Sequence, residues 1–178
     1  MATNSSLDVK ARTNAEDFAE AARRHLDDVH AFLVYLTGDR AVAEDLTAET
    51  FAKALERWHR FDSNRGAVGT WLCQLARSTA LDHFRSEERR RRREGRYAIA
   101  GRGESAEPVF GDGLSPELER ALAELSAAER EVIALRVVLE LEGAAAARVL
   151  GISVSACSTR LSRALAKLEE EVSAGVAA

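Results

Sequence analysis

The sequence predicts an all-α protein made of two small helical modules. Its 178 residues are 46% hydrophobic but only 6% aromatic, and they are rich in Ala, Leu, Glu and Arg, which favour helices over strands. Apolar residues recur at helical spacing on both sides of a stretch near residues 95–116. That stretch holds both prolines and a cluster of glycines, and it has no sustained helical period. We therefore expect modules at 15–93 and 115–172, joined by a flexible linker at 94–114.

The N-terminal and C-terminal segments differ in composition. Residues 1–14 are polar and aperiodic, which predicts a disordered N-terminal tail. They lack the basic start and apolar core of a secretory signal, and no run in the chain reaches the roughly 20 apolar residues of a membrane span. We therefore expect a cytoplasmic protein that does not enter the membrane. The C-terminal tail, 173–178, is small and apolar, and its simplest interpretation is a frayed helix end.

The composition gives little support for an enzyme. The two cysteines, Cys73 and Cys157, lie far apart in the sequence, so they support neither a disulfide framework nor a metal cluster. The histidines show no metal-ligand spacing, and no Gly-rich phosphate loop or Gly-x-Ser-x-Gly elbow occurs. We expect no catalytic residue, no metal site and no cofactor.

The first module reads as three helices. Apolar residues from Phe18 to Leu36 recur at helical spacing and stop at Gly38, which predicts a helix that ends at a C-terminal glycine. In the second helix, Leu46, Leu55 and Trp58 are among the residues available for a core. A loop at 61–69 precedes a third helix, with Thr70 as its candidate N-cap. That helix runs into the basic stretch 85–93, for which a solvated helix end and a nucleic-acid contact are both open.

The second module ends in a predicted helix-turn-helix. Ser115 precedes Pro116, a cap followed by proline at the first helical position, and Ser126 with Glu129 forms a capping box. A short helix at about 144–150, the Gly151 turn and a serine-capped helix at about 154–172 complete the motif. Residues 143–168 include basic residues but no acidic one. This local positive charge favours a phosphate backbone as partner. These basic residues are Arg148, Arg160, Arg163 and Lys167.

Motifs in both modules resemble one family. The segment 39–51, Thr70-Trp71-Leu72 and Ala76-Arg77 resemble the promoter-melting module of bacterial RNA polymerase sigma factors of the extracytoplasmic-function (ECF) group. The segment 125–130 and the Gly151-Ile152 turn are similar to that group's C-terminal module. Both occur in the family's order and with its spacer, which is more specific than either motif alone. The resemblance implies a sigma factor that directs promoter-specific initiation: region 2 (15–93) opens the minus-ten element and region 4 (115–172) reads the minus-thirty-five element.

The resemblance also implies roles for individual residues. Flipped single-stranded bases need stacking and polar groups, and a duplex groove takes a helix with short polar side chains and phosphate-binding arginines. The residues implied for core polymerase binding are Asp45, Leu46, Glu49, Thr50 and Phe51. Those implied for the minus-ten element are Asn64, Arg65, Trp71, Arg77, Ser78 and Arg85. Those implied for the minus-thirty-five element are Ser155, Ser158, Thr159, Arg160 and Arg163.

The partners that follow are core RNA polymerase, through its β′ clamp and β flap, and promoter DNA. Whether an anti-sigma factor holds the protein inactive stays open. Ala177 and Ala178 resemble the Ala-Ala endings recognised by the ClpXP protease, an alternative to the frayed end. An unchanged half-life in cells after replacing both alanines with Asp would exclude this signal.

Other interpretations remain beside the sigma factor. A stand-alone helix-turn-helix regulator would use its first module to sense a ligand or to dimerise, and would bind specific duplex DNA tightly by itself. A nucleic-acid enzyme would need a metal-binding carboxylate cluster, for which no spacing argues. Trp58 and Trp71 are more often core aromatics than stacking platforms, and the acidic residues near Asp45 could simply complement the helix dipole.

Overall fold

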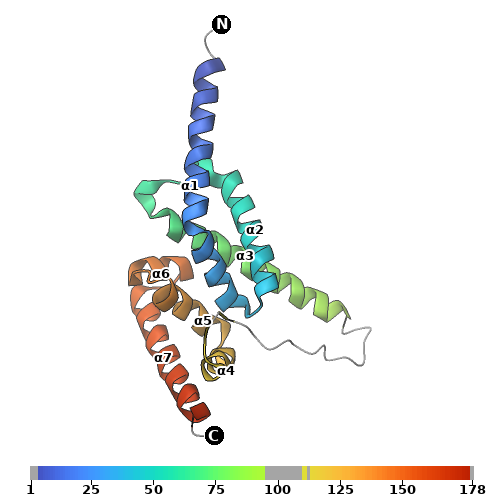
Figure 1. Ribbon diagram of the computed structural model, residues 1–178, viewed down its shortest axis with the longest axis vertical. Coiled ribbons are helices and arrows are strands. Elements are labelled where there is room, and N and C mark those ends of the chain that lie inside the picture. Colours follow the sequence, from blue (N-terminus) through green and yellow to red (C-terminus); the bar gives the residue numbers. More distant parts are fainter. Residues whose placement is uncertain (1–3, 95–109, 112, 177–178) are drawn as a thin grey trace.

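The computed structural model describes residues 4–94, 110–111 and 113–176, and every regular element in those ranges is helical. The early turns of α1 and the last turns of α7 lie at opposite ends of the molecule (Figure 1). None of the helices described is long and apolar enough to cross a membrane. The predicted all-α class is confirmed. The helices are α1 (Asn4–Thr37), α2 (Arg40–Arg57) and α3 (Val68–Glu94) in the first module, and α4 (Pro116–Glu124), α5 (Ala127–Ile133), α6 (Gly143–Leu150) and α7 (Val154–Val176) in the second.

Short turns connect these helices. Two single 3₁₀ turns, Trp58–Arg60 and Ser63–Arg65, lead from α2 to α3. A π-helical turn at Ala134–Val138 extends α5. Gly38 has a φ of 69° and ends α1, and the Asp39 side chain then accepts a hydrogen bond from the Val42 backbone N–H at 3.1 Å. A residue without a Cβ takes this left-handed conformation without strain, so the predicted glycine stop is confirmed.

The predicted caps of the second module are also present. Ser115 accepts a bond from the Leu118 N–H at 3.3 Å and is followed by Pro116. Gly151 ends α6 with a φ of 67°, and the Ser153 hydroxyl caps α7 by accepting from the Ala156 N–H at 3.1 Å. In the first module, however, the prediction of Thr70 as N-cap is wrong. The helix already begins at Val68, and Thr70 is buried within its first turn.

The core of the first module lies where α1, α2 and α3 meet. Val29, Phe32, Leu33 and Leu36 of α1 are at most 2% exposed, and Ala43 and Ala54 of α2 are fully buried beside them. On α2, Leu55 is 56% exposed, so its predicted place in the core is wrong. Because the helix turns about 100° per residue, position 55 lies about 100° around the helix from Ala54 and about 120° from Ala43, which takes it off the core-facing side.

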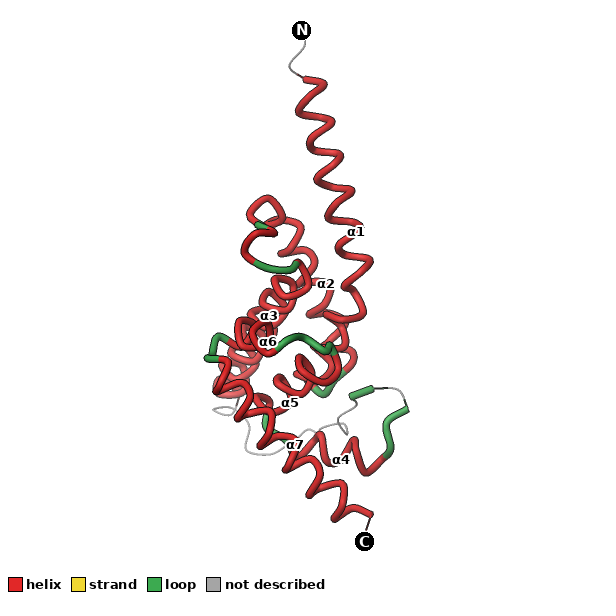
Figure 2. Tube along the Cα trace, turned by 90° about the vertical axis from the view of Figure 1, so that its left-hand side faces the viewer, coloured by secondary structure: helices red, strands yellow, loops and turns green. Residues whose placement is uncertain are grey.

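The two modules pack directly against each other. Helix α1 contacts α5 and the π-helical turn, and α3 contacts α6, so that the second module lies along the lower part of α1 in both views (Figures 1 and 2). Phe110, inside the predicted linker, is 2% exposed, with its ring centroid 6.0 Å from that of Tyr35. The expectation that only a partner positions the modules is therefore wrong. Amino-acid composition identifies the linker, but it does not show which helices of the two modules pack against each other.

Other predicted segments fall partly outside the described residues. Most of the linker, residues 95–109 and 112, is among these, as are Ala177 and Ala178. Helix α1 begins at Asn4, so the predicted disordered tail is wrong for residues 4–14. This beginning of α1 projects beyond the rest of the molecule (Figure 2). Its sequence includes good helix formers such as Lys10, Ala11 and Arg12, and adding residues to an existing helix is far easier than starting one.

The capping box of α5 gives a stability prediction. Glu129 accepts hydrogen bonds from the Ser126 backbone N–H and hydroxyl, both at 2.7 Å, and the Ser126 hydroxyl accepts from the Glu129 N–H at 3.3 Å. We expect Ser126→Ala to lower the free energy of unfolding by about 1 kcal/mol at neutral pH, because it removes the hydroxyl that bonds both the Glu129 carboxylate and the Glu129 N–H. Chemical denaturation followed by circular dichroism measures this loss.

The loss should also depend on pH. Hydrogen bonds from the Ser126 side chain, and then from its backbone, hold the pKa of Glu129 below its ordinary value. A lowered pKa stabilises the fold above the ordinary pKa of the carboxyl, and this contribution disappears as the pH falls through the lowered value. The difference between wild type and Ser126→Ala should therefore shrink on acidification, while Ser86→Ala, at an exposed site on α3, shows no such loss. A difference that grows in acid would contradict this role of Glu129.

Candidate polymerase and promoter interfaces

One face of α2 is exposed to solvent and combines acidic with apolar side chains. Asp45, Ala48, Glu49, Ala52 and Leu55 are all exposed, and their spacing places them along one side of the helix. We call these five residues the α2 face. Leu55 is the most conspicuous of them, because a leucine that is 56% exposed leaves a large apolar surface in water. Such a surface, flanked by carboxylates, suits a partner that offers basic and apolar groups.

The residues predicted to bind core polymerase divide between this face and the core. Asp45 and Glu49 are on the α2 face, and Phe51 is partly buried. Leu46 is 3% exposed and Thr50 fully buried, with the Thr50 hydroxyl donating to the Leu46 carbonyl at 2.7 Å. The prediction that these two residues contact a partner is corrected: both hold α2 in the fold. Leu55 was missed as a surface residue, although helical periodicity counted from Asp45 and Ala48 could have found it.

Aromatic rings cluster where α2 turns toward α3. The Trp58 ring stacks on Phe61 with centroids 5.2 Å apart and planes 13° apart, and Trp71 lies 5.4 Å from Phe61 and 5.9 Å from Trp58. Phe18 of α1 meets the edge of Trp58 at 5.4 Å. Both tryptophans therefore have a packing role. Trp71 has a second environment, because it also borders an open hollow.

This hollow, which we call the loop hollow, has a volume of about 430 Å³. Trp71 supplies an aromatic wall and Arg65 a cation, and Asn64, next to Arg65 in the chain, has its amide bonded to Asp62 at 3.0 Å. An aromatic ring, a cation and polar groups are what a single-stranded base and its phosphate require. The lining residues are Arg60, Phe61, Asp62, Arg65, Gly66, Ala67, Thr70, Trp71, Gln74 and Arg148.

The other residues predicted for the minus-ten element lie along α3, away from the hollow. Ser78 is exposed, and Arg85 is exposed and paired with Asp82 at 3.2 Å. Arg77 is directed toward the second module, where its Nε lies 2.9 Å and its Nη2 3.4 Å from the two carboxylate oxygens of Glu131. The structure therefore does not group Arg77 with Trp71 and Arg65.

Glu131 is a buried carboxylate, with 3% of its surface exposed. Burial raises its pKa above the ordinary value, and the neighbouring Arg77 opposes this rise without cancelling it. Burial thus disfavours the charged form of Glu131, and the ion pair with Arg77 is held against this desolvation cost. No sequence signal identifies this ion pair, because Arg77 and Glu131 are 54 positions apart.

Helix α7 presents the predicted minus-thirty-five residues on its outer face. Ser155, Ser158, Thr159 and Arg163 are exposed and Arg160 is partly buried. The opposite face is anchored by Cys157 and Ala164, which are 1% and 0% exposed. A shallow hollow of about 580 Å³ collects four of the five predicted residues, Ser158 being the exception. Short hydroxyls between arginines fit a duplex groove and its phosphates.

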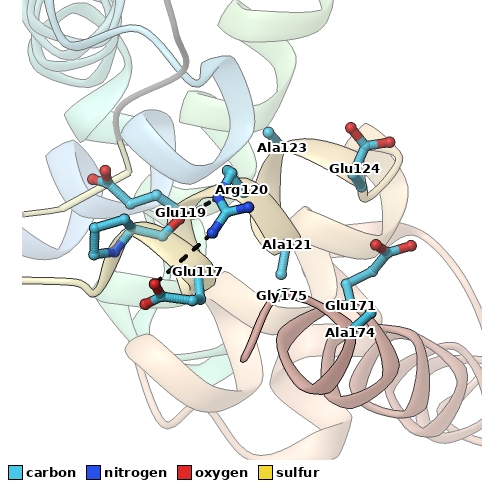
Figure 3. A pocket seen from close by; sticks show the side chains of 10 residues that line it. Glu117, Glu119, Arg120, Ala121, Ala123, Glu124, Glu171, Ala174 and Gly175 are labelled. Atoms are coloured by element: carbon cyan, nitrogen blue, oxygen red, sulfur yellow. Dashed lines mark hydrogen bonds and ion pairs between the residues drawn. The ribbon is translucent and has the colours of Figure 1, made fainter. Parts of the chain in front are cut away.

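A further hollow of about 580 Å³ lies between α4 and the end of α7 (Figure 3). Its rim carries the carboxylates of Glu117, Glu119, Glu124 and Glu171, and its one cation, Arg120, is 3.8 Å from Glu117. Carboxylates repel phosphates, so this hollow does not belong to a DNA-binding surface.

Comparison with known proteins decides the family. Sigma-70 region 2 matches residues 21–90, and Sigma-70 region 4 matches residues 115–168. The chain is 35% identical over 151 residues to the ECF RNA polymerase sigma factor SigC of Mycobacterium tuberculosis, covering 84% of this chain and 78% of SigC. It is 33% identical to SigL of the same species, covering 89% of this chain and 93% of SigL. The chain belongs to the ECF sigma factors.

Other relatives agree with this placement. The match to the ECF sigma factor BldN of Streptomyces coelicolor, at 34% identity, covers 86% of this chain and 61% of BldN. Among solved structures, the sigma factor RpoE from Bartonella quintana, in complex with the anti-sigma factor NepR, superposes with a TM-score of 0.71 at 27% identity, over 89% of this chain and 98% of RpoE. Region 2 of this sigma factor includes the α2 face and every lining residue of the loop hollow except Arg148, which belongs to region 4 together with the outer face of α7.

Proposed function

We propose that this sigma factor binds core RNA polymerase through the α2 face and directs it to promoters. The observation that carries the proposal is the presence of both sigma regions in one chain, each with an exposed surface suited to its role. The factor itself performs no catalysis, because it supplies recognition while the polymerase makes RNA. It works in the cytoplasm, where the polymerase is, and binds the β′ clamp by region 2 and the β flap by region 4.

Region 2 captures the opened minus-ten element. A base that leaves the duplex loses its stacking, and the Trp71 ring at the wall of the loop hollow can replace that stacking. Arg65 neutralises the phosphate beside it, and Asn64 offers an amide for base edges. Ser78 and Arg85 extend the path of the strand along α3, and Arg77 joins it once it is separated from Glu131.

Region 4 reads the minus-thirty-five element as a duplex. The outer face of α7 enters the major groove, where Ser155, Ser158 and Thr159 contact base edges and Arg160 and Arg163 contact bases or phosphates. Each module alone makes few contacts, so specific binding requires core polymerase to hold both at a fixed separation.

The rival, a stand-alone regulator, would need its first module to bind a ligand or a second copy. The match of that module to Sigma-70 region 2 over residues 21–90 favours the polymerase instead. The structure of RpoE with NepR concerns a sigma factor bound to an inhibitor, and we propose that an anti-sigma factor likewise controls this one.

Transcription in vitro tests the proposal. Core polymerase and a library of genomic fragments are incubated with and without this protein, and the transcript starts are sequenced. We expect new starts that share two upstream motifs at a fixed separation. An absence of core-dependent starts, with tight duplex binding by the protein alone, would favour the regulator.

A further inference from the structure

The last turns of α3 lie outside the packed core. Ala80 is fully buried, and Phe84 is partly buried against the core. From position 85 to position 93 no side chain is buried, and these turns extend beyond the other helices (Figure 1). At a rise of 1.5 Å per residue, the segment is about 13 Å long. We call residues 85–93 the basic end of α3. Because the fold does not use it for packing, its side chains are available to a partner.

The basic end is positive in a chain that is negative overall. Its six arginines and two glutamates give a formal charge of +4, whereas the whole chain carries −4. Both glutamates are paired within the helix, Glu87 with Arg90 at 2.8 Å and Glu88 with Arg92 at 2.7 Å. Arg89 and Arg93 have no ion pair among the described side chains, and the Arg93 Nε donates to the Arg89 carbonyl at 3.3 Å. Positive charge therefore remains at these two arginines.

Arg89 and Arg93 lie on the same side of α3 as the loop hollow. A helix turns about 100° per residue, so Ser78, Arg85, Arg89 and Arg93 all fall within about 40° of Trp71 around the axis. All four are exposed. Trp71 lines the hollow at the start of the helix, and Arg93 is about 33 Å further along it. One exposed stripe thus leads from the hollow to the basic end.

The helix dipole explains only part of this charge. It favours cations near a helix C-terminus, but its effect is confined to the last turn. That turn holds Arg91, Arg92 and Arg93. Arg85 and Arg89 lie before it, so the stripe of cations needs another reason.

The composition of the basic end selects the kind of ligand. Residues 85–93 are only Arg, Ser and Glu, and the segment has no aromatic ring on which a base could stack. Single-stranded bases are held by such rings, whereas a sugar–phosphate backbone is held by cations alone. The basic end therefore suits paired DNA, which presents its phosphates and keeps its bases stacked inside.

We propose that the basic end of α3 binds phosphates of the promoter duplex directly upstream of the minus-ten element, with Arg89 and Arg93 as its main contacts. This inference rests on the proposed function, which places the opened minus-ten strand at the loop hollow. Downstream of that element the strands are separated, and upstream they are still paired. The stripe from Trp71 therefore leads to the paired side.

The contact adds affinity without reading sequence. Arg89 and Arg93 are about 6 Å apart along the helix axis, which spans about two nucleotides of one strand at about 3.4 Å each. Each phosphate that a cation neutralises releases counterions and contributes about 0.9 to the slope of log K against log salt concentration. Two contacts should therefore contribute about 1.8.

The first test measures this slope for the complex of core polymerase with the full-length protein on a mapped promoter fragment. We expect Arg89→Gln combined with Arg93→Gln to lower the magnitude of the slope by about 1.8, and the affinity at 0.1 M salt by at least about tenfold. Glutamine is a good helix former and both sites are exposed, so the helix should be kept.

The matched control removes the same charge from the same turns of α3. Arg90 and Arg91 are exposed, and they lie about 100° and about 160° around the helix from Trp71, off the stripe. Arg90→Gln combined with Arg91→Gln should leave the slope unchanged. An equal fall in both double variants would mean that only net charge matters, and it would overturn the proposed contact.

The second test changes the DNA instead of the protein. Neutral methylphosphonate linkages replace the phosphates directly upstream of the minus-ten element. Wild type should lose at least about tenfold in affinity, and the variant with Arg89→Gln and Arg93→Gln should lose nothing further, because the groups it would contact are already gone. Equal losses for wild type and variant would show that these arginines do not face these phosphates, and the proposal would fail.

The outcomes separate this inference from the proposed function. The variant with Arg89→Gln and Arg93→Gln should bind core polymerase in the absence of DNA as wild type does. Weaker core binding would place the basic end on the polymerase and overturn the contact with the duplex. Normal core-dependent starts with an unchanged salt slope would also overturn the contact alone, whereas an absence of core-dependent starts with wild type would overturn the proposed function.

Discussion

Replacing Leu55 with aspartate is expected to lower the affinity for core RNA polymerase by about 30-fold or more. Leu55 is the large apolar side chain of the α2 face, and a central apolar residue of a protein interface typically contributes about 2 kcal/mol or more to binding, where 1.4 kcal/mol is a factor of ten. An aspartate there must be desolvated without a partner. Because Leu55 is 56% exposed in the free protein, the change creates no cavity and the fold should keep its stability.

The measurement is an equilibrium titration of labelled protein with core polymerase, accompanied by thermal unfolding of each variant. Leu26→Asp is the matched control, since Leu26 is a leucine on α1 that is 47% exposed. The control should bind as wild type does. Equal affinity of the Leu55→Asp and wild-type proteins would exclude the α2 face as the docking surface.

Reversing the charge of Arg163 is expected to reduce transcription from the mapped promoters by about tenfold to a hundredfold. Arg163 is exposed on the outer face of α7, and an arginine contact to a base or phosphate is worth about 1–3 kcal/mol. A glutamate at this position would also repel the phosphates it faces. Core polymerase binding by region 2 should be unaffected, so the loss belongs to promoter recognition.

Arg120→Glu makes the same charge change elsewhere in region 4, where Arg120 is exposed and paired with Glu117. It should transcribe at the wild-type level. Arg163→Glu should also weaken the salt dependence of promoter binding. The slope of log K against log salt concentration should fall in magnitude by about 0.9, the contribution of one phosphate contact. If both variants lose activity equally, the effect is one of net charge and α7 has no special role.

Local signals in the sequence were enough to predict much of this fold. The glycine stop at Gly38, the capping box of Ser126 with Glu129 and the Gly151 turn each depend on residues within a few positions of one another, and the structure has all three. Helical periodicity likewise predicts which face of each helix is buried. The placement of Leu55 in the core did not respect this periodicity, and it was wrong.

Contacts between distant segments could not be predicted from such signals. The pairing of Arg77 with Glu131 spans 54 positions, and the approach of Arg148 to Arg65 spans 83. Phe110 was assigned to a flexible linker because glycine and proline lie close to it in the sequence. In the structure its ring is buried and packs against Tyr35. For the candidate sites, the sequence therefore predicted which types of residue take part. It did not predict the contacts that these residues make with the other module.

The most direct test of the sigma-factor function is strand opening at one mapped promoter, followed by the fluorescence of 2-aminopurine placed in the minus-ten element. The protein alone, core polymerase alone and the two together are compared. We predict a rise in fluorescence only with both, and its loss with Trp71→Ala. A rise with the protein alone, or the same rise with core polymerase alone, would contradict the assignment of promoter opening to this sigma factor bound to core.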